Sequence, residues 1–209
     1  MVRESLEWVH YESWEGEKKV LLIGDSIVWG AHKYVDKYLP DGVASTTAVT
    51  AHGVNQEQLF DATLTLANLN DIKYEAVYFN NGLHTRGQSA DEYEENYRKM
   101  IKRLMEAIPA KAWILGLSTP VTDSDDRGEG HSTPVTDGSK TPADEMNDLV
   151  IEYNKRVRKI ADELGVFCFD AYSLMEDKKH MKIDIYHFNE EGREIYAKAV
   201  AEALISQIK

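Results

Sequence analysis

The sequence contains little cysteine and little positive charge. Its single cysteine, Cys168, excludes a disulfide within the chain. The 24 lysines and arginines are outnumbered by 36 aspartates and glutamates, which gives a formal net charge of -12. Binding to nucleic acid or to an anionic membrane surface requires clustered lysine and arginine side chains, so this composition argues against both kinds of partner.

Long apolar segments are absent as well. No stretch approaches the ~18 consecutive apolar residues of a membrane-spanning helix. The first residues, Met1-Val2-Arg3-Glu4-Ser5, lack the apolar core of a signal peptide. We therefore expect an intracellular, cytoplasmic protein without a membrane span.

Several well-known site motifs are missing. The glycine patterns of P-loop and dinucleotide-binding proteins do not occur, and we therefore expect no cofactor. The Gly-x-Ser-x-Gly pattern of the α/β-hydrolases is also absent around Ser26, the serine discussed below.

What the chain does contain is an alternation of strand-like and helix-like segments. Apolar runs typical of buried strands alternate with amphipathic helical stretches, which predicts an α/β fold with a five-stranded parallel sheet between two helical layers. Ser89 and Glu92 form the pattern of a capping box before one helix, and Thr141-Pro142 begins another that ends at Gly165. A last helix is expected after Asn189. The strands are expected at Val20–Ile23, Val43–Val49, Ala76–Phe79, Ala112–Leu117 and Val166–Phe169.

Two segments fall outside this alternation. Residues 1–19 are polar and aromatic, and we treat them as an N-terminal arm on a single domain of residues 20–209. Residues 121–140 have no helical or strand period and predict an irregular loop, which is either a mobile lid or an insertion without a role.

The residues that suggest chemistry lie at the two ends of the predicted domain. Gly24-Asp25-Ser26 directly follows the first buried strand, so it places a hydroxyl at the carboxyl end of the sheet, where ligands bind in such folds. Near the other end, Asp184 and His187 are three residues apart and precede the last helix. A serine, a histidine and an aspartate are the three parts of an acyl-transfer site, because serine needs a base and the base needs an orienting acceptor.

Together with Gly53 and the segment Phe79-Asn80-Asn81-Gly82-Leu83-His84, these blocks resemble, in order and spacing, the SGNH/GDSL hydrolases. This family of esterases and lipases has a flavodoxin-like three-layer α/β/α fold. The resemblance implies that Ser26 is the nucleophile, His187 the general base and Asp184 the residue that orients the imidazole. It also implies that the backbone N–H groups of Ser26 and Gly53 are oxyanion donors.

The third block differs from the family pattern Gly-x-Asn-Asp, whose asparagine is the third oxyanion donor. An alignment without gaps places His84 at the donor position, whereas a shift of one to three residues offers Asn81 or Asn80. An imidazole N–H and a carboxamide N–H are both adequate donors. We favour His84 and keep Asn81 as the alternative.

Other residues near these blocks have simpler interpretations. Asp25 is expected to brace the turn, and Trp29 and His32 to pack behind Ser26. His52 is a weaker candidate for the pocket. A metal site built from His180, Asp184 and His187 is not favoured, so no metal is expected.

The sequence therefore predicts a serine esterase that acts on a small or carbohydrate-linked acyl ester, such as an acetyl ester, through an acyl-enzyme. The expected partner is a small-molecule ester, with an acylated carbohydrate as one form of it. Two alternatives stay open. One is an acyltransferase that uses the same three residues, and the other is a catalytically inactive domain that only binds a ligand.

Overall fold

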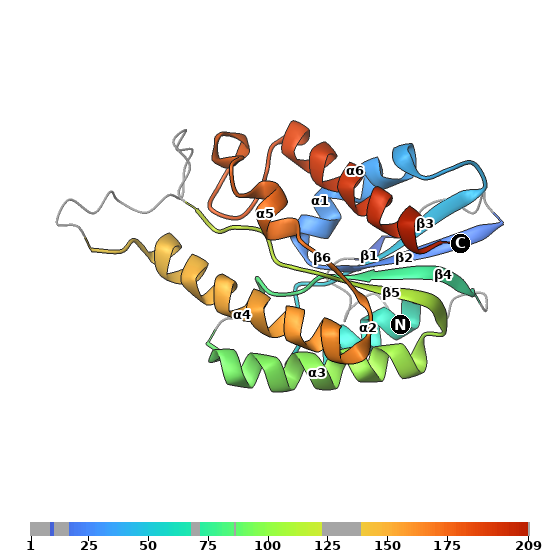
Figure 1. Cartoon of the computed structure of the whole chain (residues 1–209), viewed down its shortest axis with the longest axis horizontal. Coiled ribbons are helices and arrows are strands. Elements are labelled where there is room, and N and C mark those ends of the chain that lie inside the picture. The colour runs from blue at the N-terminus through green and yellow to red at the C-terminus, as the bar shows by residue number, and fades with distance from the viewer. Residues whose placement is uncertain (1–8, 11–16, 68–71, 86, 123–138, 209) are drawn as a thin grey trace.

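The computed structural model describes residues 9–10, 17–67, 72–85, 87–122 and 139–208. A central sheet lies between two layers of helices (Figure 1). The sheet has the strand order β1-β3-β2-β4-β5-β6. Its strands are β1 (Val9–His10), β2 (Lys18–Gly24), β3 (Val43–Val49), β4 (Tyr74–Phe79), β5 (Ala110–Gly116) and β6 (Phe167–Phe169).

Strands β2 to β6 are parallel to one another, as predicted. The strand β1 was not predicted. It lies within the expected arm and pairs antiparallel with β3, through Val9 with Ala48 and His10 with Thr47. Lys18 and Lys19 were assigned to the arm as well, but they extend β2, because their backbones continue the ladder with β3.

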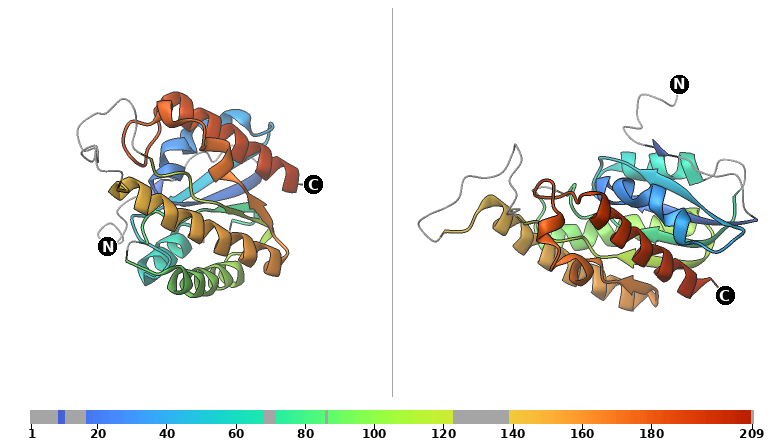
Figure 2. Two further views of the ribbon diagram at one scale, coloured as in Figure 1. Left: turned by 60° about the vertical axis from the view of Figure 1, so that its left-hand side comes forward. Right: turned by 90° about the horizontal axis from the view of Figure 1, so that it is seen from above.

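The helices cover both faces of the sheet (Figure 2). Helices α1 and α6 pack together on one face, and α2, α3 and α4 contribute to the core on the other. The α-helices are α1 (Ser26–Val35), α2 (Glu57–Ala67), α3 (Ala90–Ala107), α4 (Pro142–Leu164), α5 (Ala171–Met175) and α6 (Glu190–Gln207). Two short 3-10 helices, η1 (Asp36–Tyr38) and η3 (Lys179–Met181), complete the described secondary structure.

Strand β2 is buried on both faces, as its apolar run predicted. Val20 and Leu22 belong to the core beneath α1 and α6, whereas Leu21 and Ile23 belong to the core on the opposite face. Alternate side chains of a strand point to opposite faces, so four consecutive apolar residues fill both cores. The three-layer α/β/α architecture is confirmed.

The sequence patterns for helix ends correctly predicted where several helices begin and end. The capping box of Ser89 and Glu92 begins α3, and a second capping box begins α4 at Thr141. Gly165 ends α4 in the left-handed conformation, with a φ of 66°. The side chain of Asn189 accepts a hydrogen bond from Gly192 at the start of α6.

The register of the sheet brings the loops that follow the strands to one edge. Gly24 is aligned with Val49, and Ile23 is aligned with Phe79. The chain order reverses at β2, because β3 lies on one side of it and β4 on the other. Ligands bind at such a switch point in open α/β sheets.

Most of the predicted 121–140 loop lies outside the described residues. Among the described helices, none is long and apolar enough to cross a membrane.

Candidate active site

Ser26 is the first residue of α1, directly after the carboxyl end of β2. Asp25 caps the helix, and its Oδ1 accepts a hydrogen bond of 3.0 Å from the Ile27 N–H, which confirms the predicted brace. Gly24 allows the loop after β4 to approach, since a Cβ at this position would lie 2.9 Å from the Asn80 carbonyl oxygen and 2.3 Å from Val28 Cγ2. The turn therefore presents the Ser26 side chain at the sheet edge.

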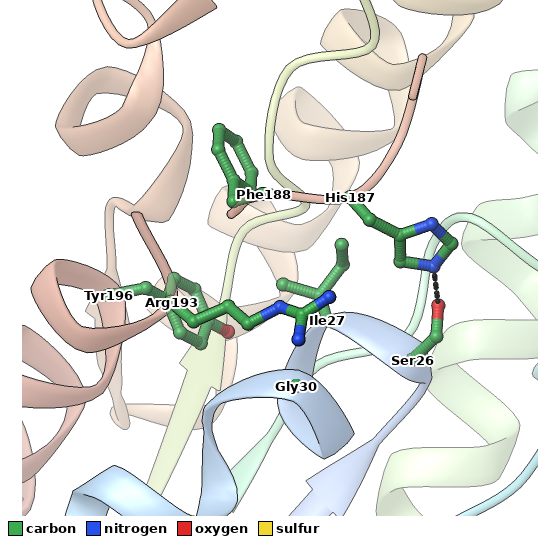
Figure 3. A pocket seen from close by; sticks show the side chains of 7 residues that line it. All are labelled: Ser26, Ile27, Gly30, His187, Phe188, Arg193 and Tyr196. Carbon is green, nitrogen blue, oxygen red and sulfur yellow. Dashed lines mark hydrogen bonds between the residues drawn. The ribbon is translucent and has the colours of Figure 1, made fainter. Parts of the chain in front are cut away.

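Ser26, His187 and Asp184 form a continuous chain of hydrogen bonds. His187 Nε2 lies 2.8 Å from Ser26 Oγ, the contact drawn in Figure 3. His187 Nδ1 lies 2.6 Å from Asp184 Oδ2. With the proton on Nδ1, the imidazole donates to Asp184 and its Nε2 accepts from the serine hydroxyl. The structure thus joins three residues that the sequence separates by up to 161 positions.

Asp184 is held in place by the backbone of its own loop. Its Oδ1 accepts hydrogen bonds of 2.7 Å from the N–H groups of Tyr186 and His187. Burial acts to raise the pKa of Asp184, but the hydrogen bonds from His187 and Tyr186 outweigh it and hold this pKa below its usual range. A carboxylate that stays ionised is suited to stabilise a positive charge on the imidazole.

The sequence analysis did not identify Lys182, which supports the same loop from inside the protein. It is 4% exposed, and its Nζ donates to the carbonyl oxygens of Pro120 at 2.7 Å and Tyr186 at 2.9 Å. Its ammonium group also lies 4.0 Å from the centre of the Phe188 ring. Burial lowers the pKa of Lys182 to about 7. A lysine between the apolar residues Met181 and Ile183 was the only sequence signal for this role.

Two backbone N–H groups were predicted to bind an oxyanion. The Ser26 N–H is in the first turn of α1 and has no acceptor among the described residues. The Gly53 N–H, in contrast, donates a hydrogen bond of 2.8 Å to Gln56 Oε1. A Cβ at Gly53 would lie 2.7 Å from the His84 carbonyl oxygen, so only glycine lets these two loops approach this closely.

The side chains of the third block have different surroundings. Both amide hydrogens of Asn80 are used, because its Nδ2 donates to the carbonyl oxygens of Gly116 at 3.0 Å and Leu117 at 2.9 Å. Asn81 Nδ2 donates to the His52 carbonyl oxygen at 2.9 Å. The two asparagines therefore fasten the loop after β4 to its neighbours.

His84 is half-buried, and its ring has no hydrogen-bond partner within the part of the chain that the structure describes. Burial raises the pKa of the Asp25 carboxyl group, and the nearby His84 ring partly opposes this rise. Asp25 is the residue before Ser26, and the His84 ring keeps an N–H that no described residue accepts.

An open cleft begins at Ser26 and His187. It has a volume of about 440 Å³, and its lining includes Trp29, His32 and Ile183. Trp29 and His32 stack on each other, with ring centroids 4.5 Å apart, so they both pack as expected and line the cleft. His52 is not among the residues that line it.

A second, much smaller space lies on the same side of Ser26. Its volume is about 10 Å³, and the apolar residues around it are Ile27, Phe188 and Tyr196 (Figure 3). This volume is close to that of one water-sized sphere. Across the described ranges of the chain, no three His, Cys, Asp or Glu side chains are grouped to hold a metal ion.

Comparison with known proteins assigns the family. Residues 22–195 match the model of the GDSL-like lipase/acylhydrolase family. The chain belongs to this family. It is therefore a carboxylic ester hydrolase. A search of the curated proteins found no match.

Solved structures of GDSL esterases have the same fold. A carbohydrate acetylesterase from Sinorhizobium meliloti is 16% identical, with a TM-score of 0.68 over 91% of this chain and 99% of that one. A putative arylesterase from Agrobacterium tumefaciens is 16% identical, with a TM-score of 0.66 over 92% and 100%. An acetylxylan esterase from Geobacillus stearothermophilus is 15% identical, with a TM-score of 0.66 over 92% and 96%.

Proposed function

We propose that this GDSL family member hydrolyses short acyl esters, in particular acetyl esters of a carbohydrate, through an acyl-enzyme on Ser26. The observation that carries the proposal is the chain of hydrogen bonds from Ser26 Oγ through His187 to Asp184, at the mouth of the cleft. The printed activities of the similar structures, which include acetylesterases of carbohydrates, support the choice of substrate class.

The proposed reaction begins when Ser26 Oγ attacks the ester carbonyl carbon and its proton passes to His187 Nε2. The negative charge then moves to the carbonyl oxygen, which the N–H groups of Ser26 and Gly53 and the His84 ring stabilise. When the carbonyl re-forms, the bond to the alcohol oxygen breaks, and the imidazolium returns its proton to that oxygen. The acetyl group is left on Ser26, and Asp184 stabilises the imidazolium during the exchange.

In the second half, His187 takes a proton from a water molecule that attacks the acyl-enzyme. Acetate then leaves, and Ser26 regains its proton from the imidazole. The side chain of His187 is 33% exposed, so water reaches the base easily. This access favours hydrolysis over transfer of the acyl group to another hydroxyl.

The size of the small space beside Ser26 supports a short acyl group. About 10 Å³ between Ile27, Phe188 and Tyr196 accommodates a methyl group better than a long chain. The cleft of about 440 Å³ is large enough for the alcohol portion, including a sugar ring.

Replacement of the proposed nucleophile and base tests this function. We expect Ser26→Ala and His187→Ala each to lower kcat for 4-nitrophenyl acetate by roughly 10⁴- to 10⁶-fold, because the two groups act as a unit. A fluorophosphonate should label Ser26, as located by mass spectrometry. Ser206→Ala, at an exposed serine of α6, is the control and should leave labelling and kcat unchanged. A label on another residue would refute the proposal.

A further inference from the structure

A further residue, Arg193, faces the proposed reaction centre from helix α6. It lines both the small space and the open cleft, together with Ser26, Gly30 and His187. Figure 3 shows its guanidinium group extending from α6 across Gly30 toward Ser26 and His187. Arg193 therefore borders both the space proposed for the acyl group and the cleft proposed for the alcohol portion.

Arg193 differs from the other arginines that the structure describes. Arg98, Arg103, Arg156 and Arg158 each form an ion pair with a carboxylate. For Arg193 the described residues provide no carboxylate within 4.0 Å, although the chain has 36 acidic side chains. Because Arg193 is half-buried and lines the open cleft, its unpaired guanidinium is available to a bound ligand.

Helix α1 makes room for this side chain. A Cβ at Gly30 would lie 3.1 Å from Arg193 Nε and 3.3 Å from its Cδ, so the arginine lies against the backbone of α1. Glycine is unfavourable inside a helix relative to alanine. Gly30 is also four residues after Ser26, hence on the same face of α1 as the serine.

The other cation of the cleft is already paired. Lys33 Nζ lies 3.7 Å from Glu190 Oε1, and this glutamate also accepts a hydrogen bond from Tyr34. Arg193 is thus the unpaired positive group among the described residues that line the cleft. A guanidinium group matches a carboxylate through two parallel N–H···O hydrogen bonds.

We infer that Arg193 binds a carboxylate on the alcohol portion of the substrate, so that the preferred substrate is an acetyl ester of an acidic sugar or a similar hydroxy acid. This inference rests on the proposed function. The small space beside Ser26 is too narrow for a carboxylated acyl group, which places the anion on the alcohol side in the larger cleft.

The test compares two matched esters, glucose and glucuronic acid acetylated at the same hydroxyl, by release of acetate. We expect the wild-type protein to have the higher kcat/KM for the glucuronate ester. Arg193→Gln should lower that value by about 10- to 100-fold, the loss expected for one charge-assisted pair, and change the glucose ester by less than about threefold. The unchanged neutral ester also shows that the variant is folded.

Two further variants make the test specific. Lys33→Gln removes a charge from the same cleft and should change the ratio of the two kcat/KM values by less than about threefold, because this lysine already has a partner. Gly30→Ala keeps the charge but displaces the guanidinium, so it should reduce the preference for the glucuronate ester. Equal losses on both esters in Arg193→Gln, or no preference in the wild type, would overturn the inference.

Binding of the deacetylated sugars separates this inference from the proposed function. Glucuronate should shift the NMR signals of the Ser26→Ala protein at concentrations where glucose does not, and Arg193→Gln should abolish the shift. If neither ester is hydrolysed but glucuronate binds in this way, the proposed function fails and anion recognition stands. If hydrolysis is normal and glucuronate does not bind, recognition of the carboxylate fails alone.

Discussion

At the scale of single residues, polar side chains near Ser26 divide into those that hold loops and those with unused donors. Asn80 donates both of its amide hydrogens to carbonyl oxygens of a neighbouring segment, and Asn81 donates one of its two to the His52 carbonyl oxygen. His84 has no such bond in the described residues, and its ring is near Asp25. This difference supports His84 as the third oxyanion donor that the ungapped alignment proposes.

His84→Ala should therefore reduce kcat for 4-nitrophenyl acetate by roughly 10²- to 10³-fold, the usual effect of deleting one oxyanion donor. KM should change little, because the contact strengthens only as the negative charge develops. His84→Asn should recover part of the loss. Steady-state kinetics of the three proteins measures both parameters.

Asn81→Ala is the matched control for this prediction. It removes the bond to the His52 carbonyl oxygen, so it should cost about 1–3 kcal/mol of unfolding free energy and change kcat much less. The assignment to His84 fails if Asn81→Ala loses kcat a hundredfold while His84→Ala stays within threefold. Asn81 would then be the third donor.

At the scale of elements, the loop between β3 and α2 contains a proposed oxyanion donor, the Gly53 N–H, that already forms a hydrogen bond within the protein. The Gly53 N–H donates to Gln56 Oε1, so an oxyanion has to displace this amide oxygen before it can use the donor. The competition adds to the barrier by roughly the net value of one hydrogen bond, about 0.5–1.5 kcal/mol.

Gln56→Ala should consequently raise kcat by up to about tenfold, since the Gly53 N–H is freed. Gln56→Glu keeps an acceptor and adds a negative charge beside the developing oxyanion, so it should lower kcat. Gln56 is exposed, and both variants should unfold at temperatures close to that of the wild type. A fall in kcat for Gln56→Ala would remove Gly53 from the proposed oxyanion hole.

The loop that contains Asp184 and His187 depends on Lys182 in a way that varies with pH. The pKa of Lys182 in the folded protein is about 7, well below the value of about 10.4 expected when the chain is unfolded. Between these two values the unfolded chain binds more protons at this site, so the free energy of unfolding rises with pH across this window.

Lys182→Met should lose this rise, which chemical denaturation at pH 6, 7, 8 and 9 measures. The variant should also be less stable overall, because the carbonyl oxygens of Pro120 and Tyr186 lose their donor. Lys198→Met, at an exposed lysine of α6, should keep the wild-type dependence on pH. Equal slopes for the wild type and Lys182→Met would contradict the low pKa.

At the scale of the whole molecule, an ion-pair network joins two helices on one face of the sheet. Glu94 of α3 lies 2.7 Å from Lys159 and 3.1 Å from Arg156, both on α4, and 2.9 Å from Arg98 of its own helix. The hydrogen bond from Lys159, followed by that from Arg98, lowers the pKa of Glu94 against the opposing effect of burial.

A carboxylate with a lowered pKa in the folded state stabilises the protein above its unfolded pKa, and this contribution is lost as the pH falls. Glu94→Gln should therefore cost about 1 kcal/mol of unfolding free energy at pH 7, the upper range for partly exposed pairs. The difference should shrink as the pH falls below the unfolded pKa of about 4.3 and disappear once the pH is below the lowered pKa of the folded state. Glu95→Gln, at the exposed neighbouring residue, is the control and should have no comparable effect. A loss that persists at low pH would show that packing, not charge, is responsible.

Many helix ends, one buried strand and one turn of the site depend on interactions between residues close in sequence. The capping boxes at Ser89 and Thr141 and the left-handed end at Gly165 use contacts within a few residues, so their sequence patterns predict them directly. The short spacing of Asp184 and His187 likewise lets one carboxylate bind both the ring and the backbone of the same turn. The apolar run of β2 predicts burial on both faces because alternate side chains face opposite cores.

Contacts between distant segments determine which of the candidate donor groups have no hydrogen-bond acceptor in the protein. The hydrogen bond from Gly53 to Gln56 depends on the path of its loop, and that from Asn81 to His52 joins two different loops. The position of Arg193 above Gly30 depends on how α6 packs against α1. The pairing of β1 depends on the free edge of β3, which no sequence pattern near β1 indicates. The five parallel strands, several helix ends and the residue types of the site could be predicted from the sequence alone, because they depend on near neighbours. Only the packed structure determined which donors are occupied and where the unpaired charge lies, because these depend on contacts between distant segments.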